Sequence, residues 1–167
     1  PDMVALAREF QEYQFVVTAV PWIDRGIYDT IIGDSGVKYL SDRTQQTLAH
    51  STAAIVTSGT ATLETALMGI PEVVLYHVPW LYEKLKPYFL RIPYISLVNI
   101  NLGRESVKEL VRARLSIAES SAELRAILPG GSKREQMLKD FDELRTMIGD
   151  EGASHRFAQD IVNTLRQ

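Results

Sequence analysis

The chain has 167 residues, of which 46% are hydrophobic and 23% charged, with a net charge of −3 and no cysteine. This length predicts one domain that buries enough apolar surface to fold without disulfides. The composition excludes a disordered chain, and the lack of cysteine excludes thiolate metal sites. The slightly acidic charge argues against nucleic acid as a partner. No apolar run has the length of a membrane span.

Helix-like and strand-like segments alternate through the first hundred residues. Apolar spacing predicts helices over 2–11, 22–32, 43–50, 60–68 and 80–91. Runs of β-branched and aromatic residues predict strands over 14–20, 37–40, 53–57, 72–77 and 94–98. This alternation is typical of parallel βαβ units in an α/β fold, and the apolar strands favour a sheet covered by helices on both faces.

Beyond residue 100 the character of the sequence changes. The pattern there predicts helices over 104–114, 119–128, 132–148 and 154–166. No linker divides the chain convincingly. We therefore expect a single domain over 1–167, with a βα core over 1–100 and a mainly helical part over 101–167.

Residues 55–64 (IVTSGTATLE) combine a short apolar strand, a turn of small residues and the start of a helix. Free backbone N–H groups and the positive end of the helix dipole meet at such a point, which favours an anion, most often phosphate. Gly59 lets a ligand approach the backbone, and Ser58 and Thr60 add hydroxyl donors. Glu64, one turn further, has the position of an acceptor for a ribose diol. A capped turn without a ligand is the alternative, because the P-loop and Rossmann glycine patterns are absent.

Three strings carry a resemblance to a known family: SGTATLETALMGIPEVVLY, YISLVNINLGRESVKELV and SKREQMLKDFDELRTMIG. In order and approximate spacing they resemble the carboxyl-terminal half of bacterial lipid-A-disaccharide synthases, which are GT-B glycosyltransferases. The resemblance covers about residues 1–166. It implies a Rossmann-like parallel sheet flanked by helices, as in a GT-B carboxyl-terminal domain, with a helical carboxyl-terminal extension.

The resemblance also implies a reaction. The family transfers a 2,3-diacylglucosamine unit from its UDP donor to 2,3-diacylglucosamine 1-phosphate, giving the lipid A disaccharide of Gram-negative bacteria. This chain would be the UDP-sugar-binding half, cytoplasmic and peripheral to the inner membrane, with no metal or other cofactor. The family's catalytic carboxylate lies in its amino-terminal half, which has no counterpart here, so we expect no catalytic residue and no activity in this chain alone.

Two alternatives remain open. One is another UDP-sugar enzyme of the same architecture, such as a UDP-N-acetylglucosamine 2-epimerase. The other is a non-catalytic α/β interaction module.

The family pattern assigns roles to individual residues. By resemblance, the residues that bind the donor are Ser58, Gly59, Thr60 and Ala61 at the diphosphate, Glu64 at the ribose, and Asn99, Arg104 and Glu105 in an N-x-x-x-x-R-E stretch at the cleft. From the local sequence alone, Arg104 is instead a surface residue at a helix start, paired with Glu105 or Glu109. His77 stands where relatives often carry Lys or Arg, so a phosphate role for it is in doubt. The three histidines are too far apart in sequence to predict a metal site.

Two further segments invite hypotheses. Residues 79–93 (PWLYEKLKPYFLRIP) mix aromatic and basic side chains, as a segment at a lipid surface does, although a helix packed on the sheet is the plainer interpretation. The predicted helix over 154–166 carries one apolar stripe. That stripe packs on its own domain or supports a homodimer.

Overall fold

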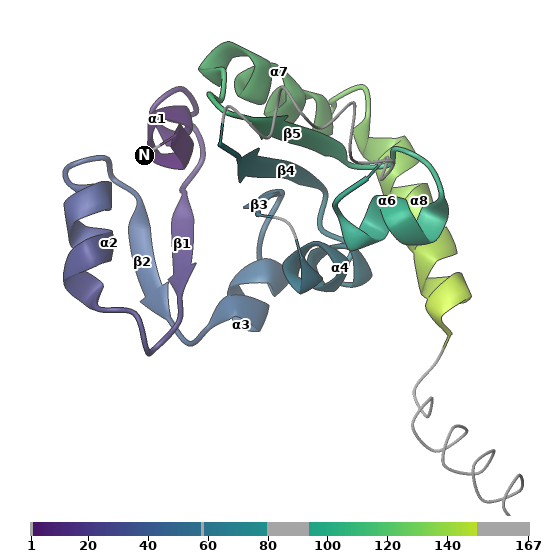
Figure 1. Cartoon of the computed structure of the whole chain (residues 1–167), viewed down its shortest axis with the longest axis horizontal. Helices are drawn as coiled ribbons and strands as arrows, with labels where there is room; N and C mark the ends of the chain where they lie inside the picture. Colours follow the sequence, from purple (N-terminus) through teal and green to yellow (C-terminus); the bar gives the residue numbers. More distant parts are fainter. Residues whose placement is uncertain (1, 58, 80–93, 150–167) are drawn as a thin grey trace, which may run out of the picture.

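The computed structural model describes residues 2–57, 59–79 and 94–149. All of its strand pairs are parallel and helices flank the strands, so the predicted α/β class with a Rossmann-like arrangement is confirmed (Figure 1). The predicted helices over 80–91 and 154–166 lie outside the described residues. None of the described helices has the length and apolar character that crossing a membrane requires.

The first sheet has two strands and belongs to what we call the strand lobe, residues 16–41. It contains β1 (Val16–Ala19), α2 (Arg25–Ile32) and β2 (Lys38–Ser41). Strand β1 pairs with β2 in the register Val17↔Tyr39. The side chain of Asp24 caps α2 by accepting from the Gly26 N–H at 2.8 Å. Helix α3 (Thr44–Ala49) then connects the lobe to the rest of the chain.

The second sheet has three strands in the order β3–β4–β5 and forms the centre of what we call the body. Its strands are β3 (Ala54–Val56), β4 (Glu72–His77) and β5 (Lys108–Arg112). Its helices are α1 (Asp2–Ala7), α4 (Thr60–Leu67), α6 (Leu97–Leu102), α7 (Ile117–Ile127) and α8 (Arg134–Ile148). Figure 1 shows α7 above β4 and β5 and α4 below them, so both faces of this sheet are covered.

The hydrophobic core lies in the body. Strand β4 runs through its centre, with Val73 and Val74 fully buried between helices. The largest buried side chains around it come from α1, α6, α7 and α8 and the segments beside them, and include Phe10, Phe141, Ile127, Leu144 and Val98. Burying this much apolar surface is the main source of stability in such a domain. The body is therefore the stable framework that positions the candidate site.

Between residues 94 and 114 the sequence predicts a strand followed by a helix, whereas the structure has a helix followed by a strand. The strand predicted over 94–98 is wrong, because α6 begins at Leu97, capped by Ser96 and ended by Gly103 in the left-handed conformation at φ 67°. The helix predicted over 104–114 is also wrong, because residues 108–112 form β5 and pair with β4. A short apolar run fits either element by periodicity alone, so the tertiary pairing decides.

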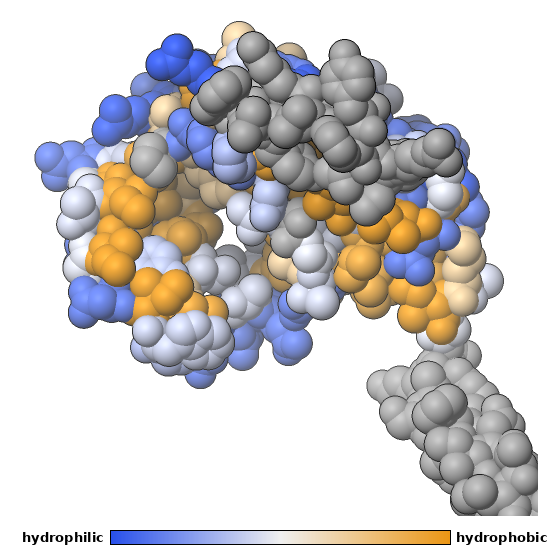
Figure 2. Space-filling model, in the orientation of Figure 1, coloured by the Kyte–Doolittle hydropathy of each residue, from blue (hydrophilic) through white to orange (hydrophobic). Residues whose placement is uncertain are grey.

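The remaining predicted elements appear with shifted ends. Helices predicted over 119–128 and 132–148 are confirmed as α7 and α8, whereas the helix predicted over 2–11 ends at Ala7. The strands do not form one sheet as expected: β1 and β2 stand apart from β3, β4 and β5. Figure 2 shows a hollow between the strand lobe and the body, with apolar side chains exposed around it.

Candidate functional site

The turn before α4 joins a strand to a helix, as the sequence predicts. Gly59 has φ 114° and ψ −155°, a conformation that side chains disfavour. Thr62 is buried, and its hydroxyl donates to the Gly59 carbonyl at 2.9 Å, which fixes the start of the helix. Thr60 and Ala61 are exposed there. The first N–H groups of a helix have no acceptor inside it, so they remain available to a ligand. Ser58 lies outside the described residues.

Glu64 lies one turn further along α4 and is half-buried. Its carboxylate accepts a hydrogen bond from the side-chain amide of Gln45 on α3, at 3.3 Å. Glu64 also borders a groove of about 1210 Å³ between the strand lobe and the body, whose lining includes Thr57 and Ala61. Of the residues predicted to bind the donor, Ala61 and Glu64 line this groove.

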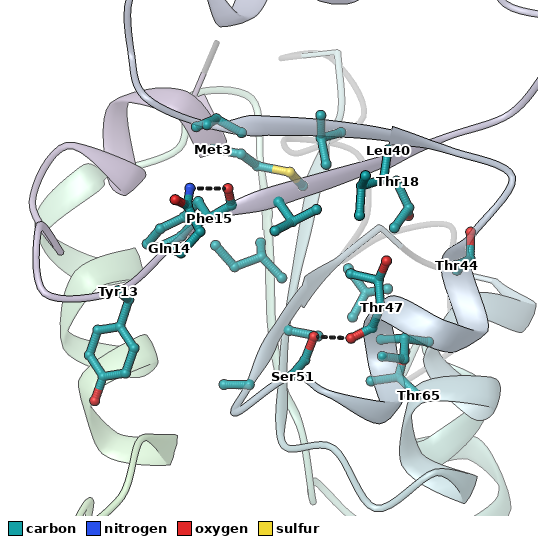
Figure 3. A pocket seen from close by; sticks show the side chains of 18 of the residues that line it. Met3, Tyr13, Gln14, Phe15, Thr18, Leu40, Thr44, Thr47, Ser51 and Thr65 are labelled. Carbon is teal, nitrogen blue, oxygen red and sulfur yellow. Dashed lines mark hydrogen bonds between the residues drawn. The ribbon is translucent and has the colours of Figure 1, made fainter.

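The close-up of this groove shows side chains on opposite walls. Figure 3 places Met3, Phe15, Thr18 and Leu40 along one wall and Thr47, Ser51 and Thr65 along the other. The lining mixes residues with hydroxyl groups and residues with aliphatic side chains, and Arg43 and Glu64 are among its few charged residues. Its chemistry suits an apolar or neutral polar occupant more than a free anion.

Asn99 lies on α6, which packs beside α4, but its side chain is turned into the protein. Its amide oxygen accepts from the N–H groups of Ser106 and Val107 at 2.7 and 3.0 Å. Its amide nitrogen donates to the Val107 carbonyl at 2.8 Å and to the Glu109 carboxylate at 2.9 Å. The whole hydrogen-bonding capacity of this amide is thus used inside the body.

Glu109 completes this network from β5. Its carboxylate accepts from the N–H groups of Ile95 and Ser96 at 2.8 and 2.9 Å and from the Ser96 hydroxyl at 2.8 Å, besides the bond from Asn99. These bonds fix the start of α6 against β5. The sequence interpretation missed this role. The sequence gives no signal for it, because the predictions placed Glu109 in a helix instead of a strand and Asn99 in no helix or strand.

Arg104 follows α6 and reaches across to α8. Its guanidinium donates to Asp140 at 2.9 Å and also pairs with Glu143. Burial alone would raise the pKa of Asp140, but the hydrogen bonds from Arg104 and Gln136 outweigh it and hold that pKa below its usual value. The bond from Arg104 likewise lowers the pKa of Glu143, and the two carboxylates raise the pKa of Arg104.

The local sequence predicts that Arg104 pairs with Glu105 or Glu109, and this prediction is wrong. Glu105 is exposed and pairs with Lys108 at 3.1 Å, while Glu109 is occupied by α6. His77 ends β4 and is exposed, opposite Arg112 in the β4–β5 register. Within residues 2–57, 59–79 and 94–149, no three His, Asp or Glu side chains are grouped so that they would hold a metal ion.

Comparisons with known proteins agree on one family. The family model described as lipid-A-disaccharide synthetase matches residues 5–160. A lipid-A-disaccharide synthase of Anaeromyxobacter dehalogenans (strain 2CP-1) and one of Myxococcus xanthus are each 33% identical over 99% of this chain, and the match covers 45% of each relative. One of Syntrophus aciditrophicus is 36% identical over 74% of this chain and 32% of its own length. The chain thus spans about half the length of the first two of these relatives.

Proposed function

Because the chain belongs to the lipid-A-disaccharide synthetase family, we propose that it is the donor-binding half of a lipid A glycosyltransferase. It holds the UDP part of UDP-2,3-diacylglucosamine at the turn before α4. The single observation that carries this proposal is Gly59 at φ 114°, immediately before the exposed residues Thr60 and Ala61, which begin an eight-residue helix. That turn follows the carboxyl end of β3, where open α/β sheets bind their ligands.

In this proposal the turn acts on the leaving group. When an acceptor hydroxyl attacks the anomeric carbon, the bond from that carbon to the diphosphate oxygen breaks and negative charge grows on UDP. The N–H groups of Thr60 and Ala61 and the dipole of α4 stabilise that charge without rearrangement. The hydroxyl proton passes to a carboxylate outside this chain. No metal ion is needed for the step as proposed.

Glu64 serves as the acceptor for the ribose hydroxyls. The side-chain amide of Gln45 donates to this carboxylate at 3.3 Å and so holds it in place beside the groove. The ribose hydroxyls then donate to the same carboxylate, either together with Gln45 or in its place.

We assign the N-x-x-x-x-R-E stretch a divided role. Glu105 is exposed, and in this proposal it is the member that contacts the donor. Asn99 and Arg104 fix the loop that carries it, Asn99 through residues 106–109 and Arg104 through α8. In this proposal Asn99 and Arg104 therefore act on the site indirectly, by fixing the conformation of the loop.

Calorimetry with UDP tests the proposal on the 167-residue chain. We expect binding by the native chain and at least about tenfold weaker binding by Glu64→Ala, the loss of one hydrogen bond to a charged group. Glu135→Ala is the matched control, because Glu135 is an exposed carboxylate in the first turn of α8. No heat with the native chain, or equal affinity of Glu64→Ala, would contradict the proposal.

The reaction itself is tested on a longer protein that includes the region preceding residue 1 in the relatives, with both lipid substrates. We propose the cytoplasmic face of the inner membrane as its place of action, because both substrates are acylated. Contact through residues 79–93 predicts that Trp80→Ser with Phe89→Ser lowers co-sedimentation with liposomes. A homodimer through 154–166 predicts a concentration-dependent mass in sedimentation.

A further inference from the structure

Strand β4 extends beyond β3 at the carboxyl edge of the body's sheet. The last residue of β3, Val56, is in register with Val74, whereas β4 continues to His77. The chain leaves the sheet after β3 and begins α4 at Thr60. Tyr76 therefore lies about 7 Å past the last partner of β3, beside the place where the chain turns into α4.

The side chain of Tyr76 lies on the face of β4 that α4 covers. The Glu72 carboxyl, at the start of the strand, lies near the hydroxyl of Thr65 on α4. Because side chains alternate between the two faces of a strand, Tyr76 shares the face of Glu72. His77 is then on the opposite face, which α7 covers. Of the two exposed residues that end β4, Tyr76 is thus the one on the side of the candidate site.

The height of Tyr76 along the sheet matches the start of α4. From Thr65 back to Thr60 the helix rises about 7.5 Å toward the carboxyl edge, and from Glu72 to Tyr76 the strand rises about 13 Å. An anion held by the first N–H groups of the helix lies about 3 Å further out than the helix itself. It therefore lies close to the level of Tyr76.

The hydroxyl group of Tyr76 is available to a ligand. Tyr76 follows four buried residues of β4 and is itself 39% exposed. Its hydroxyl group forms no hydrogen bond with any residue that the structure describes. A phenol donates one hydrogen bond without carrying a charge, so it suits an anion that the backbone already holds.

We infer that the Tyr76 hydroxyl donates a hydrogen bond to the diphosphate of a nucleoside diphosphate donor at the start of α4. This inference rests on the proposed function, and it adds a third donor to the N–H groups of Thr60 and Ala61. The phenol keeps its proton throughout the transfer. Its hydrogen bond becomes stronger as negative charge grows on the leaving diphosphate.

Calorimetry with UDP tests the inference on the 167-residue chain. Tyr76→Phe removes the hydroxyl and keeps the ring, so we expect at least about tenfold weaker binding, the loss of one hydrogen bond to a charged group. Tyr39→Phe is the matched control, because it removes a hydroxyl from β2, away from the turn before α4. His77→Ala tests the assignment of faces. Both of these variants should bind UDP as the native chain does.

Uridine separates a contact with the diphosphate from a change in the shape of the site. It carries the base and the ribose but no phosphate, so Tyr76→Phe and the native chain should bind it equally, as ligand-detected NMR measures. An unchanged affinity of Tyr76→Phe for UDP, or equal weakening for UDP and uridine, would overturn the inference. So would weakening by His77→Ala as large as that by Tyr76→Phe. Absence of UDP binding by the native chain would refute the proposed function, and this inference with it.

Discussion

The guanidinium of Arg104 donates to the carboxylate of Asp140 at 2.9 Å, across 36 residues of sequence. Only 7% of the Asp140 side chain is exposed, while 44% of the Arg104 side chain is. Glu143 on the next turn of α8 shares the same guanidinium. The guanidinium that the family pattern assigns to the cleft is thus paired with two carboxylates. These ion pairs connect the loop after α6 to helix α8.

Arg104→Ala should lower the melting temperature, because it leaves the Asp140 carboxylate buried without its cation. Glu143→Ala should have a smaller effect, since Glu143 is half exposed. Thermal unfolding by circular dichroism measures both, with the exposed Arg114→Ala as control. Equal melting temperatures of Arg104→Ala and Arg114→Ala would show that the ion pair contributes nothing.

The same pair predicts an acid dependence. The pKa of Asp140 is lowered in the folded chain from a usual value of 3.8, so its stabilising effect is present above that value and is lost as the pH falls below it. Denaturant unfolding between pH 5 and pH 2 should show a steeper loss of stability below about pH 4 for the native chain than for Arg104→Ala. Parallel curves would argue against this linkage.

Glu72 predicts the opposite slope at higher pH. It is fully buried at the start of β4, and no described residue hydrogen bonds to its carboxyl oxygens. Burial raises its pKa from 4.5 to about 9, and the nearby Thr65 hydroxyl, which donates to the Ala61 carbonyl, opposes this only in part. The folded chain then keeps a proton that the unfolded chain releases, so stability falls as the pH rises between these values.

Glu72→Gln removes this titration. We expect it to stabilise the chain at pH 7 by about 3 kcal/mol and to flatten the stability curve between pH 5 and pH 9. Urea unfolding across that range measures both effects. Glu135→Gln is the control, because Glu135 is exposed. A retained slope in Glu72→Gln would place the titrating group elsewhere.

Asn99 and Asn101 lie on the same short helix and make a matched comparison. Asn99→Ala leaves the N–H groups of Ser106 and Val107 and the carbonyl of Val107 without their partner, so we expect a loss of about 3 kcal/mol. Asn101 is exposed and its side chain donates to the Leu97 carbonyl, so Asn101→Ala should change stability by less than about 0.5 kcal/mol. Similar unfolding free energies of the two variants would contradict the structural role of Asn99.

Gly59 and Gly130 both have positive φ, at 114° and 80°, with open space where a Cβ would lie. Alanine at either position should lower stability by about 1–2 kcal/mol through backbone strain. Only Gly59→Ala should also weaken UDP binding, because Gly130 lies in the turn between α7 and α8. Calorimetry on both variants separates the two effects, and equal loss of affinity would count against the turn as the diphosphate site.

Local chemistry in the sequence determined the α/β class, most of the elements, and the strand–turn–helix around Gly59. These features depend on neighbouring residues: β-branched runs, apolar spacing, and a glycine where φ must be positive. Tertiary structure alone decided the exchange of α6 and β5, the inward turn of Asn99, and the pairing of Arg104 with α8. Each of these depends on a hydrogen bond or strand pair between segments distant in the chain, and such partners leave no local pattern. The division of the strands into two sheets was also decided by tertiary structure alone. The residue patterns of β1 and β3 are compatible with an unpaired strand edge as well as with a paired one.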